Sequence, residues 1–374
     1  MAGDGLLAHI SRRALLAGLT ATACSRKRAA RYHGWLFVAG GEGKSVAVAD
    51  LAFFRRVATI PLPHAPDQLF YSAGRVFATC REGQVLVVID PQTLRVAGRI
   101  GLPGKPAAAH LAQDGRTAII VTDEPNALLA IDLVKQRVAA RLTLPGGASD
   151  LDVNQGQAAI AIPSLNSIVR IVLPALKLTG ITDVGVPCAA LRFRRDGKTI
   201  LAGAPAAREI VTIDAATGKL LARLPLPIAP SRFCFNGDGG QMFVTGTGED
   251  AVAIVSPFQN EVDQTILAGR TPYAMAVSDS RNLLFVTNME SGDLTILDIE
   301  TRSRAASVHV GENPGDVLLT PDGEYALVID RRTGNVSVVR ITTVLDRKVR
   351  TKPLFTVFPT AADARSAIIV PFET

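Results

Sequence analysis

Several short polar segments of the sequence place arginine beside acidic residues. Arg81 lies in 'CREGQ', Arg208 in 'APAARE', and the pair Arg331 and Arg332 in 'DRRTG'. A guanidinium group can donate two parallel hydrogen bonds to a carboxylate or phosphate, so these segments could bind a polar ligand or a peptide. A solvated loop face without a ligand would have the same composition, and both interpretations stay open. The full set of candidate ligand-binding residues is His64, Arg81, Lys105, Asp123, Arg208, Arg232, Glu249, Tyr273, Glu290, Arg331 and Arg332.

Histidine offers a second kind of chemistry. His64 or His110 could act as an acid–base pair with a carboxylate such as Asp67 or Asp123. The same two histidines could also ligate a haem iron or another metal. Two histidines without further ligands do not by themselves indicate a metal site, so packing or surface positions are the favoured interpretation. The sequence therefore predicts no metal and no cofactor.

Motifs that define other catalytic sites do not occur in the sequence. There is no GxSxG, HExxH, GxxxxGK[ST], CxxC or CxxCH pattern. The segment 'GGEGKS' at Gly40–Ser45 has the wrong glycine spacing for a phosphate-binding loop and leads into an expected strand. Trp35 is the single tryptophan, which gives no support for a tryptophan-rich quinone site. These absences favour a binding protein over an enzyme and name no catalytic residue.

The basic excess of the sequence lies at its N-terminus. Residues 1–35 carry six of the 40 lysine and arginine residues but only one of the 34 acids. The remainder has 34 basic and 33 acidic residues and is nearly neutral. A neutral body argues against a broad nucleic-acid surface, which needs clustered positive charge.

Residues 1–23 are predicted to be an export signal. Arg12 and Arg13 precede the apolar run Ala14–Ala23, which is shorter than the about 20 residues that a membrane-spanning helix needs. The segment resembles a bacterial twin-arginine signal, and its ending 'ATAC' resembles a lipoprotein signal that would lipidate Cys24. We expect a periplasmic or membrane-anchored bacterial lipoprotein with a basic linker at 24–35. A disordered basic arm is the alternative. The other cysteines, Cys80, Cys188 and Cys234, are expected to be free thiols.

A repeat of about 42 residues positions the candidate residues. Each unit contains four short apolar runs, here called strands A to D, which are separated by polar turns. The turns between A and B contain Asp, Gly or Asn, as in 'QDGR' and 'PDGE', and such residues close tight hairpins. Equivalent positions in strand B occur at intervals of 40 to 43 residues, at Phe37, Phe77, Ile120, Ala161, Leu201, Phe243, Phe285 and Leu327.

Such units predict an all-β propeller, because a ring of four-stranded antiparallel blades covers faces that one small sheet leaves exposed. The first unit lacks strand A, whereas the last segment, 'ARSAIIVPF', looks like an isolated strand A that completes it. Eight blades in a single domain at 36–374 are therefore expected. The long connection 'ITTVLDRKVRTK' in the last unit leaves seven blades as the alternative. The D–A and B–C loops share one face, where the candidate residues fall.

Three segments carry a resemblance to a known family. 'FVTN' at Phe285–Asn288, 'TPDGEYALVID' and 'DLTILDIETRS' resemble the YVTN family of WD-like β-propeller repeats, and the resemblance covers residues 36–374. The family includes exported bacterial proteins of the YncE type, mostly with binding or scaffold roles. The resemblance implies an exported, non-enzymatic, monomeric propeller that binds an unknown protein or a small polar ligand on its loop face and in its central funnel. A cofactor-binding or lactonase-like periplasmic enzyme and a nucleic-acid-binding propeller are the alternatives.

Overall fold

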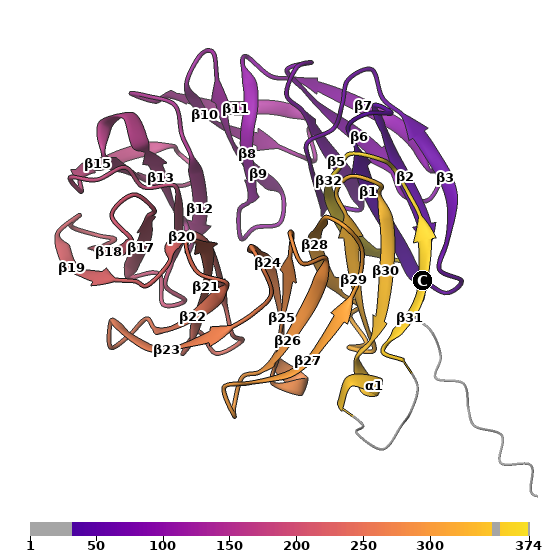
Figure 1. The fold of residues 1–374 in the computed structure, drawn as a ribbon. Coiled ribbons are helices and arrows are strands. Elements are labelled where there is room, and N and C mark those ends of the chain that lie inside the picture. The colour runs from indigo at the N-terminus through magenta and orange to yellow at the C-terminus, as the bar shows by residue number, and fades with distance from the viewer. Residues whose placement is uncertain (1–31, 346–351, 373–374) are drawn as a thin grey trace, which may run out of the picture. The chain divides into compact units, whose positions relative to one another are not determined.

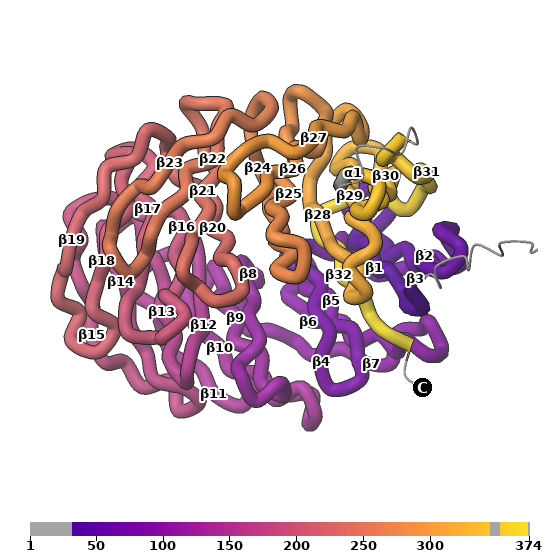
Figure 2. Tube along the Cα trace, turned by 90° about the horizontal axis from the view of Figure 1, so that it is seen from below, coloured from indigo at the N-terminus to yellow at the C-terminus, as the bar shows by residue number. Residues whose placement is uncertain are grey.

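The computed structural model describes residues 32–345 and 352–372 of the chain. The predicted export signal and Cys24 lie outside this part. Its strands form eight four-stranded antiparallel sheets, which confirms the prediction of eight blades. Figure 1 shows the blades following one another around a common centre, from indigo through magenta and orange to yellow, and Figure 2 shows them from below. In each blade we call the strands A to D from the centre outward.

The strands of the first four blades follow the repeat, each blade being given from A to D. Blade 1 contains β32 (Ala364–Pro371), β1 (Gly34–Gly40), β2 (Ser45–Asp50) and β3 (Arg55–Pro61). Blade 2 contains β4 (Gln68–Ser72), β5 (Arg75–Cys80), β6 (Val85–Asp90) and β7 (Arg95–Gly101). Blade 3 contains β8 (Lys105–Leu111), β9 (Thr117–Asp123), β10 (Ala127–Asp132) and β11 (Arg137–Thr143). Blade 4 contains β12 (Asp150–Asn154), β13 (Gln157–Ile162), β14 (Ser167–Val172) and β15 (Lys177–Asp183).

The last four blades continue the same order. Blade 5 contains β16 (Ala190–Phe193), β17 (Thr199–Ala204), β18 (Glu209–Asp214) and β19 (Leu220–Pro225). Blade 6 contains β20 (Ala229–Phe235), β21 (Met242–Thr247), β22 (Ala251–Ser256) and β23 (Glu261–Leu267). Blade 7 contains β24 (Pro272–Ser278), β25 (Leu283–Asn288), β26 (Asp293–Asp298) and β27 (Ser303–His309). Blade 8 contains β28 (Pro314–Leu319), β29 (Tyr325–Asp330), β30 (Asn335–Arg340) and β31 (Leu354–Pro359).

Burial differs between the middle and outer strands of a blade. Every residue of β25, 'LLFVTN', is buried, because both of its faces pack against neighbouring blades. The outer strand β7 alternates between exposed residues and residues that are half-buried or buried, since one of its faces meets solvent. Continuous apolar runs in strand B and alternating patterns in strand D are the expected signatures of these two environments. The core is thus divided into layers between blades.

The A–B turns use the glycines that the sequence predicts. Gly115 and Gly323 have φ of +60° and +68°, a conformation that strains residues with a side chain. In the turn before β9, the Asp114 carboxylate accepts hydrogen bonds from the amides of Arg116 and Thr117. These local contacts fix the hairpin that returns the chain from strand A to strand B.

The chain closes the ring by pairing its last strand with its first. β32 lies antiparallel to β1, with Trp35 opposite Val370 and Phe37 opposite Ile368. Val370 is fully buried, and the ring of Phe372 meets that of Trp35 edge-on at 4.6 Å between centroids. The prediction that 'ARSAIIVPF' completes the first blade is therefore confirmed.

The long C–D connection of blade 8 contains the short helix α1 (Ile341–Leu345), and the strand that follows, β31, still pairs with β30. The helix explains why this unit is longer than the others without changing the number of blades. No helix in the described residues is long and apolar enough to cross a membrane. β1 starts at Gly34, two residues before the expected beginning of the domain.

Ring closure can be tested with a charged residue in the last strand. Val370→Asp buries a carboxylate without a partner, so we expect the free energy of unfolding to fall by about 3 kcal/mol or more. Val357→Asp is the matched control, because Val357 lies on the outer strand β31 and is 48% exposed. We expect it to change stability by less than about 1 kcal/mol in the same urea titration. Equal losses in the two variants would contradict closure through β32.

Candidate functional site

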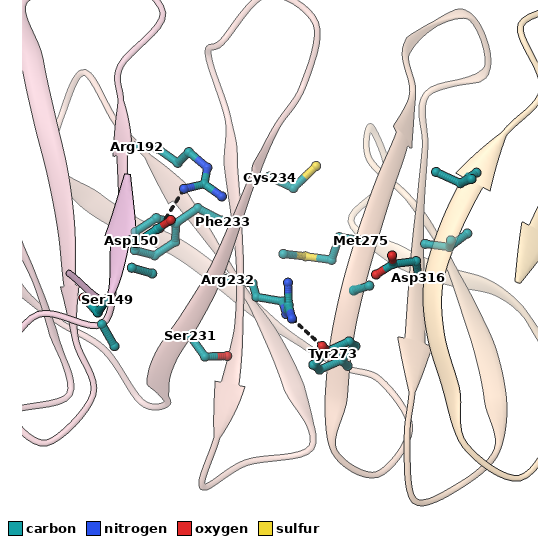
Figure 3. A pocket seen from close by; sticks show the side chains of 15 residues that line it. Ser149, Asp150, Arg192, Ser231, Arg232, Phe233, Cys234, Tyr273, Met275 and Asp316 are labelled. Atoms are coloured by element: carbon teal, nitrogen blue, oxygen red, sulfur yellow. Dashed lines mark hydrogen bonds and ion pairs between the residues drawn. The ribbon is translucent and has the colours of Figure 1, made fainter. Parts of the chain in front are cut away.

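The inner strands line a cavity of about 510 Å³. It is lined by residues of the A strands of blades 4 to 8, with some from the loops before them (Figure 3). Its polar side chains are Ser149, Asp150, Arg192, Ser231, Arg232, Tyr273 and Asp316, together with the thiol of Cys234. These residues lie in the loops before the A strands and at positions along the strands, so the cavity extends from the D–A loops into the channel.

Two arginines meet one tyrosine at the edge of this cavity, and we call Arg232, Tyr273 and Arg331 the arginine–tyrosine cluster. Arg232 and Tyr273 line the cavity itself, whereas Arg331 lines a small adjoining pocket that shares Tyr273 and Asp316 with it. The Tyr273 hydroxyl accepts a hydrogen bond from Arg232 and another from Arg331, the latter at 3.2 Å. The guanidinium carbons lie 4.0 Å and 5.3 Å from the centre of the tyrosine ring, within reach of cation–π attraction. Among the residues that the structure describes, neither arginine forms an ion pair with a carboxylate.

The carboxyl group of Asp316 interacts electrostatically with both arginines of this cluster. Asp316 lies on β28, and burial raises the pKa of its carboxyl group, while the positive charges of Arg232 and Arg331 act in the opposite direction. The carboxylate also accepts a hydrogen bond from the backbone amide of Ala367 on β32. Asp316 therefore ties blade 8 to blade 1 and only partly offsets the positive charge of the two arginines.

Other carboxylates at the channel hold the backbone of a neighbouring blade. Asp150 of β12 accepts a hydrogen bond from the amide of Leu191 at 2.9 Å and forms an ion pair with Arg192 at 2.8 Å. Asp152 of the same strand accepts a hydrogen bond from the amide of Phe193 at 2.7 Å. Both amides lie on the free edge of β16, which has no strand partner there. These carboxylates are therefore committed to joining blade 4 to blade 5.

The two candidate histidines have different surroundings. The ring of His64 packs on the B–C turn of blade 2, where a Cβ added to Gly83 would come within 2.3 Å of it. His110 lies on β8 with Nδ1 3.8 Å from Asp152 Oδ1, and burial lowers the pKa of its imidazole. A lowered pKa favours neutral imidazole, so His110 and Asp152 form at most a weak ion pair near neutral pH.

The carboxylates proposed as partners of these histidines bind arginine instead. Asp67 forms an ion pair with Arg365, and Asp123 forms one with Arg81, both at 2.7 Å. Lys105, another candidate residue, pairs with Glu124 at the same distance. The loops of blades 1 to 3 are therefore joined by charged pairs, and Arg81 and Asp123 satisfy each other.

The remaining candidates lie apart from the central cavity. Arg332 pairs with Glu312, and Arg208 donates a hydrogen bond to the carbonyl oxygen of Pro227 at 3.4 Å. Glu249 and Glu290 line a second cavity, of about 460 Å³, between the B–C loops of blades 6 and 7. Of the residues predicted from the sequence, the structure thus places three, Arg232, Tyr273 and Arg331, in one cluster.

Five of the side chains that line the cavity were not predicted from the sequence although they share the period of the repeat. Asp150, Arg192, Cys234, Met275 and Asp316 come from five successive A strands. They follow one another at intervals of 42, 42, 41 and 41 residues, so the repeat itself carries the signal. The predicted candidates were assigned to loops, whereas each of these five inner strands contributes one of these side chains to the cavity.

The three cysteines that the structure describes, Cys80, Cys188 and Cys234, are free thiols. Burial raises the pKa of Cys234 to about 11, which keeps its thiol protonated at neutral pH. In the part of the chain that the structure covers, no group of three or more His, Cys, Asp or Glu side chains is arranged to hold a metal ion.

Comparisons with known proteins support the fold. No family model matches the chain. A stretch of 154 residues is 23% identical to the seven-bladed beta-propeller protein Rv1057 of Mycobacterium tuberculosis and covers 39% of each chain, so the match spans well under half of that relative. The solved structure of dihydro-heme d1 dehydrogenase NirN in complex with DHE is similar with a TM-score of 0.77 and 14% identity, over 90% of this chain and 75% of NirN. AztD from Citrobacter koseri has a TM-score of 0.67 and 15% identity, over 91% of this chain and all of AztD. Likenesses at these identities show a β-propeller, and the function is argued separately.

His110 makes stability depend on pH. Its folded-state pKa is below the ordinary value of about 6.5, so the unfolded chain takes up the proton more readily, and the free energy of unfolding falls as pH drops below about 6.5. Asp150, Asp152 and Arg192 face the imidazole. Burial raises the pKa of the Asp152 carboxyl group, so the folded chain takes up this proton more readily than the unfolded chain. In more acidic solution this carboxyl group therefore increases the free energy of unfolding as pH falls.

His110→Gln should therefore flatten the fall in stability between pH 7 and pH 5, measured by urea unfolding at each pH. His309→Gln, at an exposed position on β27, is the control and should keep the wild-type slope. A wild-type slope in His110→Gln, or an equal change in the control, would contradict the assignment.

Proposed function

We propose that this protein is an exported binding protein whose central cavity takes a carboxylate-bearing small molecule. The observation that carries the proposal is the arginine–tyrosine cluster, whose two arginines lack a carboxylate partner among the described residues. Other arginines are committed within the protein. Arg81 and Arg192 form ion pairs, and the buried Arg170 donates hydrogen bonds to carbonyl oxygens of the next blade.

The cluster presents hydrogen-bond donors to a ligand. Because the Tyr273 hydroxyl accepts from both arginines, its own proton is directed elsewhere and can be donated to a ligand oxygen. The guanidinium groups add further N–H donors with a fixed planar geometry. A carboxylate accepts from several such donors at once, and the contacts are strengthened by charge. Asp316 nearby limits the net positive charge and would favour a ligand that also carries a hydroxyl or amino group.

The resemblance to YVTN repeats and the solved neighbours support a binding role. YVTN-type propellers are mostly binding or scaffold proteins, and the NirN structure holds a ligand within a related fold. The same chemistry could come from a compact organic acid or from the carboxylates of a tetrapyrrole. Export, lipidation of Cys24 and a monomeric state belong to the proposal. Catalysis does not.

The test measures binding of citrate by calorimetry and of haemin by absorbance, using the full chain. We expect wild-type protein to bind at least one of these probes and Arg331→Gln to weaken that binding by about tenfold to a hundredfold, because a charge-assisted hydrogen bond is lost. Arg332→Gln is the matched control, because Arg332 pairs with Glu312 and is 66% exposed. It should bind within about twofold of wild type.

The two probes distinguish the two classes of molecule that could supply the carboxylate. Citrate binding indicates a compact acid, and haemin binding indicates a tetrapyrrole. Failure of wild-type protein to bind either probe, or equal binding by wild type and Arg331→Gln, would overturn the proposal.

Tyr273→Phe tests the role of the hydroxyl separately. The substitution keeps the aromatic ring beneath the arginines but removes the oxygen that both of them contact. We expect affinity for the bound probe to fall by about threefold to tenfold, since one neutral hydrogen bond is lost and the arginines are less well fixed. Stability in urea should remain close to that of wild type because the side chain is only half-buried. Unchanged affinity would exclude the hydroxyl from the site.

A further inference from the structure

The outer strands of blades 1 to 3 carry an unusual concentration of arginine. Figure 1 shows β3, β7 and β11 on the outer side of three successive blades. Their arginine side chains are all exposed. We call this surface the basic rim, and it consists of Arg55 and Arg56 on β3, Arg95 and Arg99 on β7, and Arg137 and Arg141 on β11.

Strand periodicity places the arginines of β7 and β11 on the solvent face. The exposed positions of β7 are Arg95, Ala97, Arg99 and Gly101, two residues apart as the pleat requires. β11 repeats the pattern at 137–143, again with alanine between the two arginines. Small residues between the arginines leave the guanidinium groups uncovered. The guanidinium groups of β7 and β11 are therefore accessible to a partner surface.

The outer strands of the basic rim carry positive charge alone, although Asp50, Asp90 and Asp132 lie opposite Arg55, Arg95 and Arg137 on the neighbouring C strands. β3, β7 and β11 contain no acidic residue, whereas β23 of blade 6 exposes Glu261 and Asp263 and has no basic residue. In the residues covered by the structure, none of the six arginines of the basic rim forms an ion pair. Arg56 donates a hydrogen bond to the carbonyl oxygen of Thr360, at 2.9 Å. The positive charge is thus gathered on one side of a nearly neutral body.

Exposed apolar side chains accompany the arginines. Phe53, in the turn before β3, is 63% exposed, and the guanidinium carbon of Arg55 lies 5.2 Å from the centre of its ring. Val134, in the turn before β11, is 61% exposed. Arginine beside exposed phenylalanine and valine suits the boundary between lipid headgroups and acyl chains. A nucleic-acid duplex would attract the arginines but offers no apolar layer for the other two side chains.

We propose that the basic rim docks the propeller on a membrane surface that contains anionic lipids. The lipid phosphates would interact with the arginines of β3, β7 and β11, while Phe53 and Val134 enter the headgroup layer. The surface is separate from the central cavity, so the inference does not depend on the proposed ligand. The central cavity would stay accessible to solvent in the docked protein, because the membrane would contact only outer strands and the turns before them.

Sedimentation with lipid vesicles tests the proposal on the full chain. The vesicles contain phosphatidylcholine alone or with about 30% phosphatidylglycerol, at low and high salt. We expect at least about tenfold stronger partitioning onto the anionic vesicles and a marked loss in high salt, because surface charges are screened. The variant Arg95→Gln, Arg99→Gln, Arg137→Gln, Arg141→Gln should lose at least about tenfold of this partitioning. Phe53→Ser should weaken it by a smaller factor.

The control removes the same charge from other outer rims, with Lys177→Gln, Lys219→Gln, Arg302→Gln and Arg304→Gln. All proteins compared keep the basic residues at 1–35, so a difference between variant and control reports on the basic rim. Retained partitioning in the control supports the proposal. Equal losses in variant and control, no dependence on phosphatidylglycerol, or tighter binding to a duplex DNA of about 20 base pairs than to the vesicles would overturn it.

Discussion

The free edges of the inner strands are the constraint on which the molecule depends. In each blade, strand A pairs with strand B on one side only, so its other edge exposes backbone amides and carbonyls. Such groups need partners when they are removed from water. Side chains of the preceding blade supply them: Gln68 both donates to and accepts from the backbone of Ala109, and Ser366 accepts from the amide of Leu69. Adjacent blades are thus joined by polar contacts as well as by apolar layers.

This constraint divides the polar residues of the channel into two groups. Asp150 and Asp152 face the channel, but their carboxylates hold the edge of β16. Arg232 and Arg331 contact an aromatic hydroxyl and leave further donors free. The contacts of the second group also join blades 6, 7 and 8, but they use only part of the donors of each guanidinium group. The arginine–tyrosine cluster can therefore bind a ligand through its remaining donors while its own contacts are kept.

Much of the fold could be predicted from the sequence, because it depends on local patterns that repeat. Eight equivalent positions in strand B, turns with glycine at positive φ, and an isolated last strand were sufficient to predict eight blades and their closure. The candidate site was predicted only in part. Arg81 and Arg331 look alike in sequence, yet Arg81 pairs with Asp123 from the next blade and Arg331 contacts Tyr273. Pairing across blades depends on three-dimensional neighbours that one sequence does not reveal.

The most direct test is a crystal structure of the full chain grown with whichever probe, citrate or haemin, the protein binds. A carboxylate of the probe is expected within hydrogen-bond distance of both Arg232 and Arg331, while the carboxylates of Asp150 and Asp152 keep their contacts to the amides of Leu191 and Phe193. A probe bound at the rim loops beside Arg81 or Arg208, or an Asp150 carboxylate that leaves the Leu191 amide to contact the probe, would contradict the division of roles described above.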